Sequence, residues 1–394
     1  MNLPHFDSFS CTLPWQTDCH FSLLIDGDEF YPRMLDALNQ AHQSIELEMY
    51  LFESGIIATR YISALVDATK RGVQVRVLVD HVGSFKLQPS DQSRLRQAGV
   101  ELRIFNRLQH RHWLRNLFRD HRKIIVIDRQ LAFVGGAGIS DSFSPEVRPD
   151  SAWRETMISI EGPAVQDWLT LFERSWYFYN LRQDEAQRKI LLGALSDAPD
   201  KPLQNGTISQ ARVVASRGPG NKPIIATLLN KLTKSKQRAW LVTAYFYPSR
   251  KLVKALCKAA RHGVDVRILL PGPNTDHPSI RYAGRSWYRK LLDSGVKIYE
   301  YQPRFLHMKV ALVDNWVSIG SCNFDRWNLR WNLEANQEII DDSFSLSTVA
   351  MLENDIEQAL QIRLDSWKKR GWYQKVMERF WKWMGRFLAR IPND

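Results

Sequence analysis

The chain alternates short apolar runs with amphipathic stretches of helical period. In the first half, apolar residues three or four apart predict helices, and runs rich in branched apolar residues predict strands between them. Gly72 and Gly99 each follow a predicted helix, the position that glycine favours beyond a helix C-terminus. The expected elements are a helix over 31–42, a strand over 44–53, a helix over 59–71, a strand over 73–80, a helix over 90–98 and a strand over 99–105.

The same order of elements returns in the second half. The expected elements there are a helix over 228–237, a strand over 238–248, a helix over 250–261, a strand over 264–271, a helix over 287–292 and a strand over 295–301. Strands that alternate with helices predict an α/β fold, with a mixed sheet in each half and helices on its faces. The repetition indicates a duplicated pair of domains.

The chain is expected to divide into five parts. Its 394 residues, 44% of them hydrophobic, suffice for two domain cores. A polar stretch with Pro and Gly between the halves is typical of a linker. The parts are an N-terminal segment 1–20, a first domain 21–183, a linker 184–210, a second domain 211–350 and a C-terminal helical region 351–394.

The charge balance narrows the class of partner. Fifty-four basic against forty-two acidic residues leave a net charge of +12, which favours a polyanion, either nucleic acid or an anionic membrane surface. No apolar run reaches the ~20 residues that span a bilayer, and the start lacks a signal-peptide pattern, so any membrane contact is expected at the surface. The four cysteines lack metal-binding spacing, which predicts reduced thiols in a cytosolic setting and no structural metal.

One motif occurs twice. His121-Arg-Lys-Ile-Ile-Val-Ile-Asp128 returns as His307-Met-Lys-Val-Ala-Leu-Val-Asp314, and both copies read His-x-Lys-x-x-x-x-Asp. Such a pattern opens by chance at roughly one position in ten thousand, so two chance copies in one chain are improbable. The apolar middle predicts a short buried strand. In each copy the His and Lys, two residues apart, share one face, whereas the Asp at an odd offset is expected to be a structural anchor.

The residues after the second motif extend the pattern to Gly320-Ser321-x-Asn323. Together they resemble the signature of the phospholipase D superfamily. The first motif is followed by Gly135-Gly136-Ala137-Gly138, which matches the glycines but has Gly138 where the family usually has Asn. Backbone N–H groups of this turn, or Ser140, could replace the missing phosphate contact. The resemblance implies two duplicated phospholipase D-like domains related by a pseudo-twofold axis, with the active site at their interface.

The resemblance also implies a chemistry. Phosphodiester cleavage needs a nucleophile on phosphorus, a proton for the leaving oxygen and positive charge near the non-bridging oxygens. Two His-Lys pairs supply all three without a metal or another cofactor. By the resemblance, His121 forms a phosphohistidine, His307 is the acid that later becomes the base, and the lysines hold the phosphoryl oxygens. The candidate site comprises His121, Lys123, Asp128, His307, Lys309, Asp314, Asn323, Glu155 and Glu334.

Two of these residues are included as supports for the histidines. A catalytic imidazole is held in one tautomer by an acceptor on its second nitrogen. Glu155 follows the first motif and Glu334 the second, and both resemble family positions where an acid supports the histidine. Glu338 is an alternative for the second role. The plainer interpretation is that these glutamates lie on solvent-exposed faces and support no histidine.

The flanks of the motifs, among them 271–288 and 299–314, are similar to bacterial phospholipase D-type cardiolipin synthases. The similarity runs over about residues 21–342 and is to the subtype without N-terminal transmembrane helices. It implies a phosphatidyltransferase that joins two phosphatidylglycerols into cardiolipin and glycerol, peripheral to the cytoplasmic face of the bacterial cell membrane. Phosphatidylglycerol, phosphatidylethanolamine and an anionic membrane surface are the expected partners; nucleic acid is not expected, and a partner protein is left open. A hydrolytic phospholipase D is the near alternative, a metal-independent nuclease the distant one.

Two stretches mix basic and aromatic residues. Arginines recur at every fourth position over 103–119, and a helix there would gather them into a headgroup-binding rim or a nucleic-acid groove. Residues 372–391 place apolar and aromatic side chains beside five basic ones at helical spacing. That pattern predicts an amphipathic helix in a membrane interface, with a helix packed on the core as the alternative.

Overall fold

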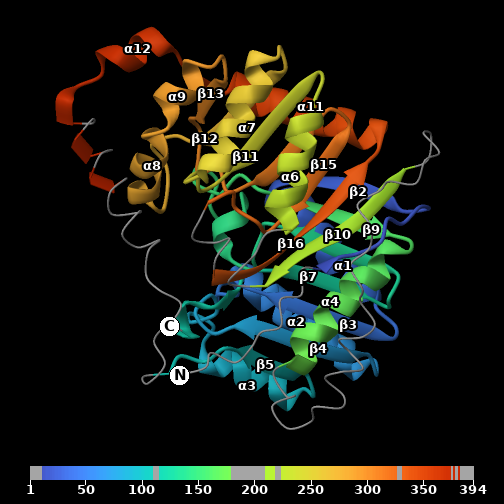
Figure 1. The fold of residues 1–394 in the computed structure, drawn as a ribbon. Helices are drawn as coiled ribbons and strands as arrows, with labels where there is room; N and C mark the ends of the chain where they lie inside the picture. The colour runs from blue at the N-terminus through green and yellow to red at the C-terminus, as the bar shows by residue number, and fades with distance from the viewer. Residues whose placement is uncertain are drawn as a thin grey trace.

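The protein consists of two α/β halves whose sheets lie face to face (Figure 1). The fold is seen in a computed structural model, which describes residues 11–109, 115–178, 209–217, 223–325, 331–373, 376–377 and 380–381. Residues 184–208, most of the expected linker, lie outside the described residues. The predicted α/β pair of duplicated domains is confirmed.

The first sheet has seven strands in the order β2-β9-β8-β7-β3-β4-β5. β3, β4 and β5 are parallel neighbours, and the other pairs are antiparallel. The strands are β2 (His20–Ile25), β3 (Ser44–Met49), β4 (Gln74–Asp80), β5 (Glu101–Phe105), β7 (Lys123–Ile127), β8 (Leu131–Gly135) and β9 (Thr156–Glu161). The helices of this half are α1 (Asp26–Gln40), α2 (Ile56–Lys70), α3 (Pro89–Gln97) and α4 (Ala164–Phe178), with short 3-10 turns η1 (Arg115–Leu117) and η2 (Asp141–Phe143).

The second sheet repeats this order as β10-β16-β15-β14-β11-β12-β13, with β1 and β17 added at its edges and β6 paired to β16. The strands are β1 (Cys11–Thr12), β6 (Arg119–Asp120), β10 (Gln210–Arg217), β11 (Arg238–Thr243), β12 (Asp265–Pro271), β13 (Lys297–Tyr301), β14 (Lys309–Val313), β15 (Trp316–Gly320), β16 (Asn332–Ile340) and β17 (Ala359–Ile362). The helices are α6 (Pro223–Lys234), α7 (Arg250–Arg261), α8 (Pro278–Arg285), α9 (Tyr288–Leu292), α11 (Asp342–Glu357) and α12 (Leu364–Lys369).

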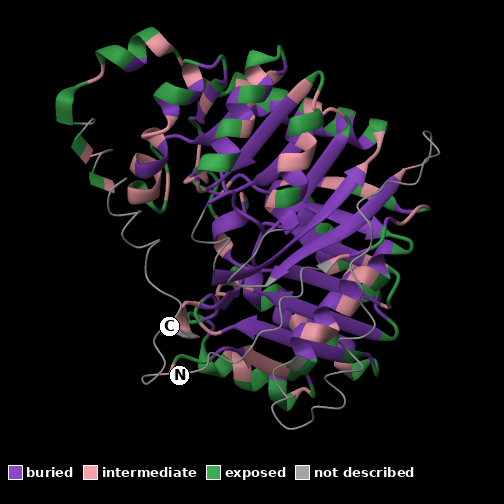
Figure 2. Ribbon diagram, viewed as in Figure 1, coloured by how far each residue is buried: buried purple, intermediate pink, exposed green. Residues whose placement is uncertain are grey.

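The facing surfaces of the sheets form one shared core. It joins Val134 of the first sheet to Val317 of the second and takes in Trp168 of α4 and Leu352 of α11. Separate cores lie under α1 and α2 on one outer face and under α6 and α7 on the other. Figure 2 shows the strands buried along their length and the exposed residues gathered on the outer helices. Because the middle core is common to both sheets, the halves are held in one relative position.

The alternating elements expected from the sequence are present in both halves, with shifts at their ends. The first strand is shorter than expected, ending at Met49, because the chain then leaves β3 and Phe52 bridges to Ile139. The chain ends also join the second sheet: β1 comes from the segment 1–20, and α11 runs across residue 350 to β17.

The helix expected over 103–119 is wrong. Arg103 lies in β5, where its guanidinium stacks 3.9 Å from the Trp176 ring centroid. Arg119 lies in β6, buried and 3.4 Å from Asp80. Strand pairing at both ends of the segment prevents a continuous helix, so Arg103 and Arg119 do not lie on one helix face; residues 110–114, which include Arg111, lie outside the described residues.

The aspartates that close the two motifs are anchors of the backbone. The Asp128 carboxylate accepts three backbone N–H bonds from residues 42–44 at 2.7–2.9 Å. The Asp314 carboxylate does the same with residues 236–238 at 2.9–3.1 Å. Both aspartates have positive φ, at 51° and 54°, a conformation that Asp tolerates. Each one ties the turn after its motif strand to the start of the neighbouring strand, away from the histidines.

Replacing Asp128 by Ala is expected to lower stability without removing a catalytic group. Loss of three N–H acceptors at a partly exposed carboxylate should cost about 1–2 kcal/mol in the free energy of unfolding, measured by urea denaturation. Burial opposes ionisation of Asp128, but the three N–H bonds hold its pKa below the ordinary value. The loss in the free energy of unfolding relative to wild type is therefore largest at neutral pH and becomes smaller as pH falls below about 4. Replacement of the exposed Asp150 by Ala serves as the control, and equal destabilisation by both changes would contradict the anchor role.

Candidate active site

Each histidine motif belongs to one half and is aligned by the other. β6 pairs in parallel with β16, and the His121 N–H that follows β6 donates to the Leu333 carbonyl at 3.0 Å. In the opposite direction, the His307 N–H donates to the Arg154 carbonyl at 2.8 Å, and the Arg154 N–H donates to the Phe305 carbonyl at 2.8 Å. These crossed backbone bonds place both motifs at the interface between the halves.

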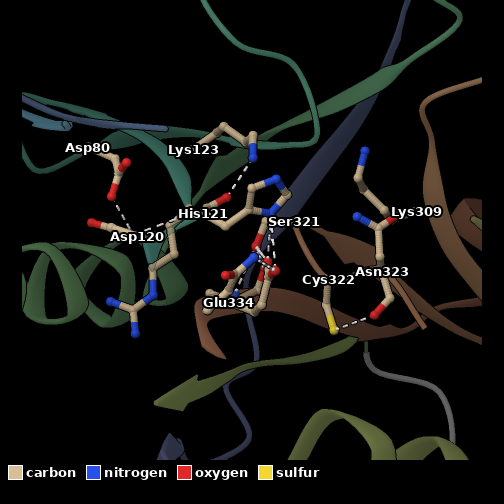
Figure 3. A network of polar contacts seen from close by, with 12 residues as sticks. Asp80, Asp120, His121, Lys123, Lys309, Ser321, Cys322, Asn323 and Glu334 are labelled. Atoms are coloured by element: carbon tan, nitrogen blue, oxygen red, sulfur yellow. Dashed lines mark hydrogen bonds and ion pairs between the residues drawn. The ribbon is translucent and has the colours of Figure 1, made fainter. Parts of the chain in front are cut away.

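The carboxylates that support the histidines are exchanged in the same way. Glu334, next to Leu333, lies 3.1 Å from Nδ1 of His121 (Figure 3). Glu155, next to Arg154, lies 2.6 Å from Nδ1 of His307. The order of the sequence associates Glu155 with the first motif and Glu334 with the second, so the structure corrects that association. A carboxylate at Nδ1 leaves Nε2 of His121 for chemistry, whereas Nε2 of His307 also lies 3.2 Å from Nζ of Lys309.

Glu338, the alternative support, has another partner. Its carboxylate forms a buried ion pair with Arg212 of β10 at 2.8 Å. Ser321 instead completes the support of His121, because its hydroxyl donates to Glu334 at 2.5 Å. Ser321 stands in the signature that the sequence displays, but its neighbour in space could not be read from the chain.

The two lysines lie inside the site. Nζ of Lys123 donates to the His121 carbonyl at 2.6 Å. Nζ of Lys309 lies 3.2 Å from Glu155 and 2.8 Å from Nδ1 of His307. Burial lowers the pKa of Lys123 to about 7, against the opposing charge of Glu334. Burial also lowers the pKa of Lys309, and it raises the pKa of Glu155 to about 7.

The imidazoles are held in their neutral form in the free protein. Burial lowers the pKa of His121, which Glu334 opposes and Lys123 reinforces. Burial lowers the pKa of His307 well below its ordinary value, and Lys309 and Lys123 add to the effect. A neutral ring with a free Nε2 is the form that can attack phosphorus or accept a proton.

Asn323 supplies a buried donor at the end of the second motif. Its Oδ1 accepts from the Thr243 hydroxyl at 3.2 Å, and among the described residues its Nδ2 has no hydrogen-bond partner. A buried amide N–H without a partner is costly, so this group suits an oxygen of a bound phosphodiester. In the first motif Gly138 is pressed against Leu51, with an added Cβ only 2.6 Å from the Leu51 side chain.

The suggestion that Ser140 replaces the missing Asn is wrong. The Ser140 hydroxyl donates to Glu53 at 2.7 Å and accepts from the Ser142 N–H at 3.2 Å. It is used to order the loop that includes η2. The side-chain donors that the two halves offer to a phosphate at these positions are therefore unequal.

The surroundings of the two rings also differ. His121 has Tyr50 beside it, with ring centroids 4.7 Å apart. His307 is packed among Trp153, Phe143 and Phe305, with ring centroids 5.1–5.6 Å away. These aromatic neighbours were not predicted, since they come from loops that the motif does not include.

Polar groups behind the first motif have no equivalent behind the second. The Asp120 N–H donates to Asp80 at 3.0 Å, and the Arg122 guanidinium approaches Glu48 at 3.5 Å (Figure 3 shows Asp80 and Asp120). At the matching positions beside His307 stand Leu306 and Met308. The two histidines thus meet different electrostatic fields despite equal motifs.

Comparisons with known proteins agree with this geometry. The family model described as "Cardiolipin synthase, PLD-like domain" matches residues 34–176 and 228–359. The chain belongs to this family of phospholipase D-like proteins. Cardiolipin synthase 2 of Bacillus anthracis is 33% identical over 363 residues, which cover 90% of this chain and 68% of that protein. A cardiolipin synthase of Halalkalibacterium halodurans is 34% identical over 360 residues, covering 90% and 70%.

A solved structure has the same overall fold as this protein. Phosphatidylserine synthase of Haemophilus influenzae superposes with a TM-score of 0.72 over 96% of this chain and 95% of its own, at 13% identity. At that identity the likeness concerns the fold alone. None of the described helices is long and apolar enough to cross a membrane. Within the described ranges, no three His, Cys, Asp or Glu side chains are grouped so that they could hold a metal ion.

The crossed supports can be tested by exchanging each glutamate for glutamine. Glu334→Gln is expected to lower the pKa of His121, because the Glu334 charge raises it, and to disturb the tautomer of that ring. The attack on phosphorus should slow roughly a thousandfold. Glu155→Gln, the matched variant, should change the titration of His307 instead. NMR of the ring Cε1–H signals distinguishes the two, and the opposite assignment would refute the crossing.

The pH profile follows from the buried lysine. Lys123, with a pKa of about 7, is charged below that value and loses its charge as pH rises through it. We expect kcat/KM, which reports groups of the free enzyme, to fall above about pH 7. In Lys123→Arg the guanidinium stays charged, so in a variant that retains activity the alkaline limb should move upward. A wild-type profile that is flat from pH 6 to 9 would contradict this role.

Proposed function

We propose that the protein is a cardiolipin synthase-like phosphatidyltransferase that works through a phosphohistidine on His121. The observation that carries the proposal is the pair of buried histidines, each supported by a carboxylate of the opposite half and each accompanied by a buried lysine. Membership of the cardiolipin synthase family implies phospholipid substrates. The steps below are derived from this arrangement.

In the first step, Nε2 of His121 attacks the phosphorus of a phospholipid. The P–N bond forms as the bond from phosphorus to the headgroup oxygen breaks, and His307 gives that oxygen its proton. The negative phosphodiester favours the imidazolium and so offsets the burial that keeps His307 neutral in the free protein. Lys123, Lys309 and the Asn323 amide are placed to stabilise the phosphoryl oxygens.

In the second step, the headgroup alcohol leaves and a hydroxyl of another lipid takes its place. His307, now neutral, accepts the proton of that hydroxyl, whose oxygen attacks phosphorus and releases His121. With phosphatidylglycerol as donor and acceptor, the products are cardiolipin and glycerol. Phosphatidylethanolamine is the other proposed donor. Water in place of the acceptor would yield phosphatidic acid, the product of the hydrolytic alternative.

We place the protein peripherally on the cytoplasmic face of the bacterial membrane. Its net charge of +12 favours an anionic lipid surface. In the C-terminal region, Trp372 and Tyr373 are 76% and 58% exposed, and Val376 and Phe380 are exposed as well. Of the amphipathic helix predicted over 372–391, residues 374–375, 378–379 and 382–391 lie outside the described residues. Exposed aromatic and apolar groups in a basic segment are suited to the bilayer interface.

The roles of the histidines can be separated with a labelled phosphatidyl donor that has a good leaving group. His121→Ala should abolish the covalent adduct, because it lacks the nucleophile. His307→Ala should accumulate the adduct. A good leaving group, such as an aryl oxide, departs without a proton, whereas the acceptor hydroxyl still needs a base. Intact-protein mass spectrometry measures the adduct, and lipid mass spectrometry measures cardiolipin made by wild type from phosphatidylglycerol. An adduct in His121→Ala and none in His307→Ala would reverse the roles.

A further inference from the structure

Beside His307 lies a small polar cluster that the two-step mechanism does not use. Tyr245, just beyond β11, packs against the His307 ring with centroids 6.4 Å apart and nearly perpendicular planes. Its hydroxyl donates to Asp276 at 2.6 Å, and its ring lies 5.3 Å from that of His277. Asp276 and His277 belong to the loop between β12 and α8 (Figure 1).

The cluster reaches from the buried site to the surface. Tyr245 is partly buried, whereas the side chains of Asp276 and His277 are 30% and 57% exposed. Burial raises the pKa of Tyr245 well above its ordinary value, and Asp276 adds to the shift, so the phenol remains a hydrogen-bond donor. One carboxylate oxygen of Asp276 is engaged by Tyr245; for the other, no partner is found in the described part of the chain.

The direction of the reaction places the headgroup on this side. In-line displacement puts the attacking Nε2 of His121 and the departing oxygen on opposite sides of phosphorus. The departing oxygen is therefore next to His307, its proton donor. The entering hydroxyl occupies the same place in the second step, by microscopic reversibility. Groups packed around His307 and open to solvent thus contact the headgroup alcohol rather than the diacylglycerol part.

We propose that Asp276, oriented by Tyr245 and flanked by His277, forms the subsite for a hydroxyl-bearing headgroup such as that of phosphatidylglycerol. This inference rests on the proposed function and adds the determinant of acceptor choice. The free carboxylate oxygen accepts from a headgroup hydroxyl, and the imidazole of His277 offers a donor or acceptor to the next one. A polyol can satisfy both groups together, whereas water can bridge only part of the subsite.

The matching place in the first half has a different chemistry. Leu51 stands at the position of Tyr245. The two residues before the first Pro of α8 are Asp276 and His277, whereas the two residues before the first Pro of α3 are Leu87 and Gln88. Tyr50 packs on His121 as Tyr245 packs on His307, but in the first half neither Leu87 nor Gln88 can take the part of Asp276 or His277. In an in-line transfer between two alcohols, both alcohols occupy the same side of phosphorus in turn. A single alcohol subsite, on the His307 side, is therefore sufficient.

The test measures the fate of a preformed adduct. The wild-type enzyme and Asp276→Asn are loaded with an aryl phosphatidyl donor in vesicles, and the adduct is then exposed to phosphatidylglycerol, to ethanolamine, whose hydroxyl can accept the phosphatidyl group, or to water alone. The ratio of transfer to hydrolysis is independent of how fast the adduct formed. For Asp276→Asn we expect the transfer-to-hydrolysis ratio with phosphatidylglycerol to fall about tenfold, the effect of one lost strong hydrogen bond. Tyr245→Phe, which keeps the ring and frees Asp276, should lower the ratio less.

Asp293→Asn is the matched control, because Asp293 carries the same charge in the same half but is paired with Arg289 on the surface. It should leave the ratio unchanged. An unchanged ratio in Asp276→Asn, or an equal fall in Asp293→Asn, overturns the subsite. A selective loss of transfer to ethanolamine would assign the site to an ammonium and overturn the polyol assignment. Absence of any adduct in the wild type would instead refute the proposed function.

Discussion

The active site depends on an exchange of support between the two halves. The backbone N–H of each histidine donates to a carbonyl of the other half, and the next residue there is the glutamate at that histidine's Nδ1. One backbone bond therefore sets both the position and the tautomer of the ring. Neither half holds a complete site alone, because its histidine and its glutamate serve different rings. Relative movement of the sheets would break both supports at once, and the shared core between the sheets prevents it.

Burial governs the chemistry of the charged groups. A cation in a low-dielectric site is destabilised unless an opposite charge is near, and Glu155 and Glu334, the carboxylates that act most strongly on Lys123 and Lys309, also serve the histidines. Among the described residues the Asn323 amide has no hydrogen-bond partner, so the free site holds buried cations together with a donor that it does not satisfy internally. A phosphodiester supplies the missing negative charge and acceptors. We infer that a bound phosphodiester stabilises the buried lysines, which the fold alone leaves in an unfavourable electrostatic environment. The same groups then contribute to substrate affinity and to stabilisation of the transition state.

Duplication explains the pairing of the motifs, and divergence explains their separate roles. The registers of β3 with β7 and of β11 with β14 place Met49 opposite Lys123 but Thr243 opposite Lys309. Thr243 binds Asn323, whereas the first motif has Gly138 at the corresponding place against Leu51. Charged residues lie behind His121, and aromatic rings surround His307. A reaction in which one histidine bonds to phosphorus and the other moves protons calls for such unequal environments.

The sequence alone determined the repeated order of strands and helices, the two motifs and the separation of His and Lys from Asp. These depend on local periodicity and on spacing along the chain, which hold whatever the rest of the fold does. The anchoring role of Asp128 and Asp314 followed from the odd offset alone, and the hydrogen bonds to residues 42–44 and 236–238 agree with it.

Only the tertiary structure decided which glutamate serves which histidine, because that assignment depends on the crossing of β6 and β16 between the halves. It likewise separated Glu338 from the site, engaged Ser140 with Glu53 and placed Arg103 and Arg119 in two different strands. The grouping of Tyr245 with Asp276 also required the structure, since the two are far apart in the chain. Contacts of this kind depend on how separate segments pack against one another, and spacing along one segment carries no record of that packing.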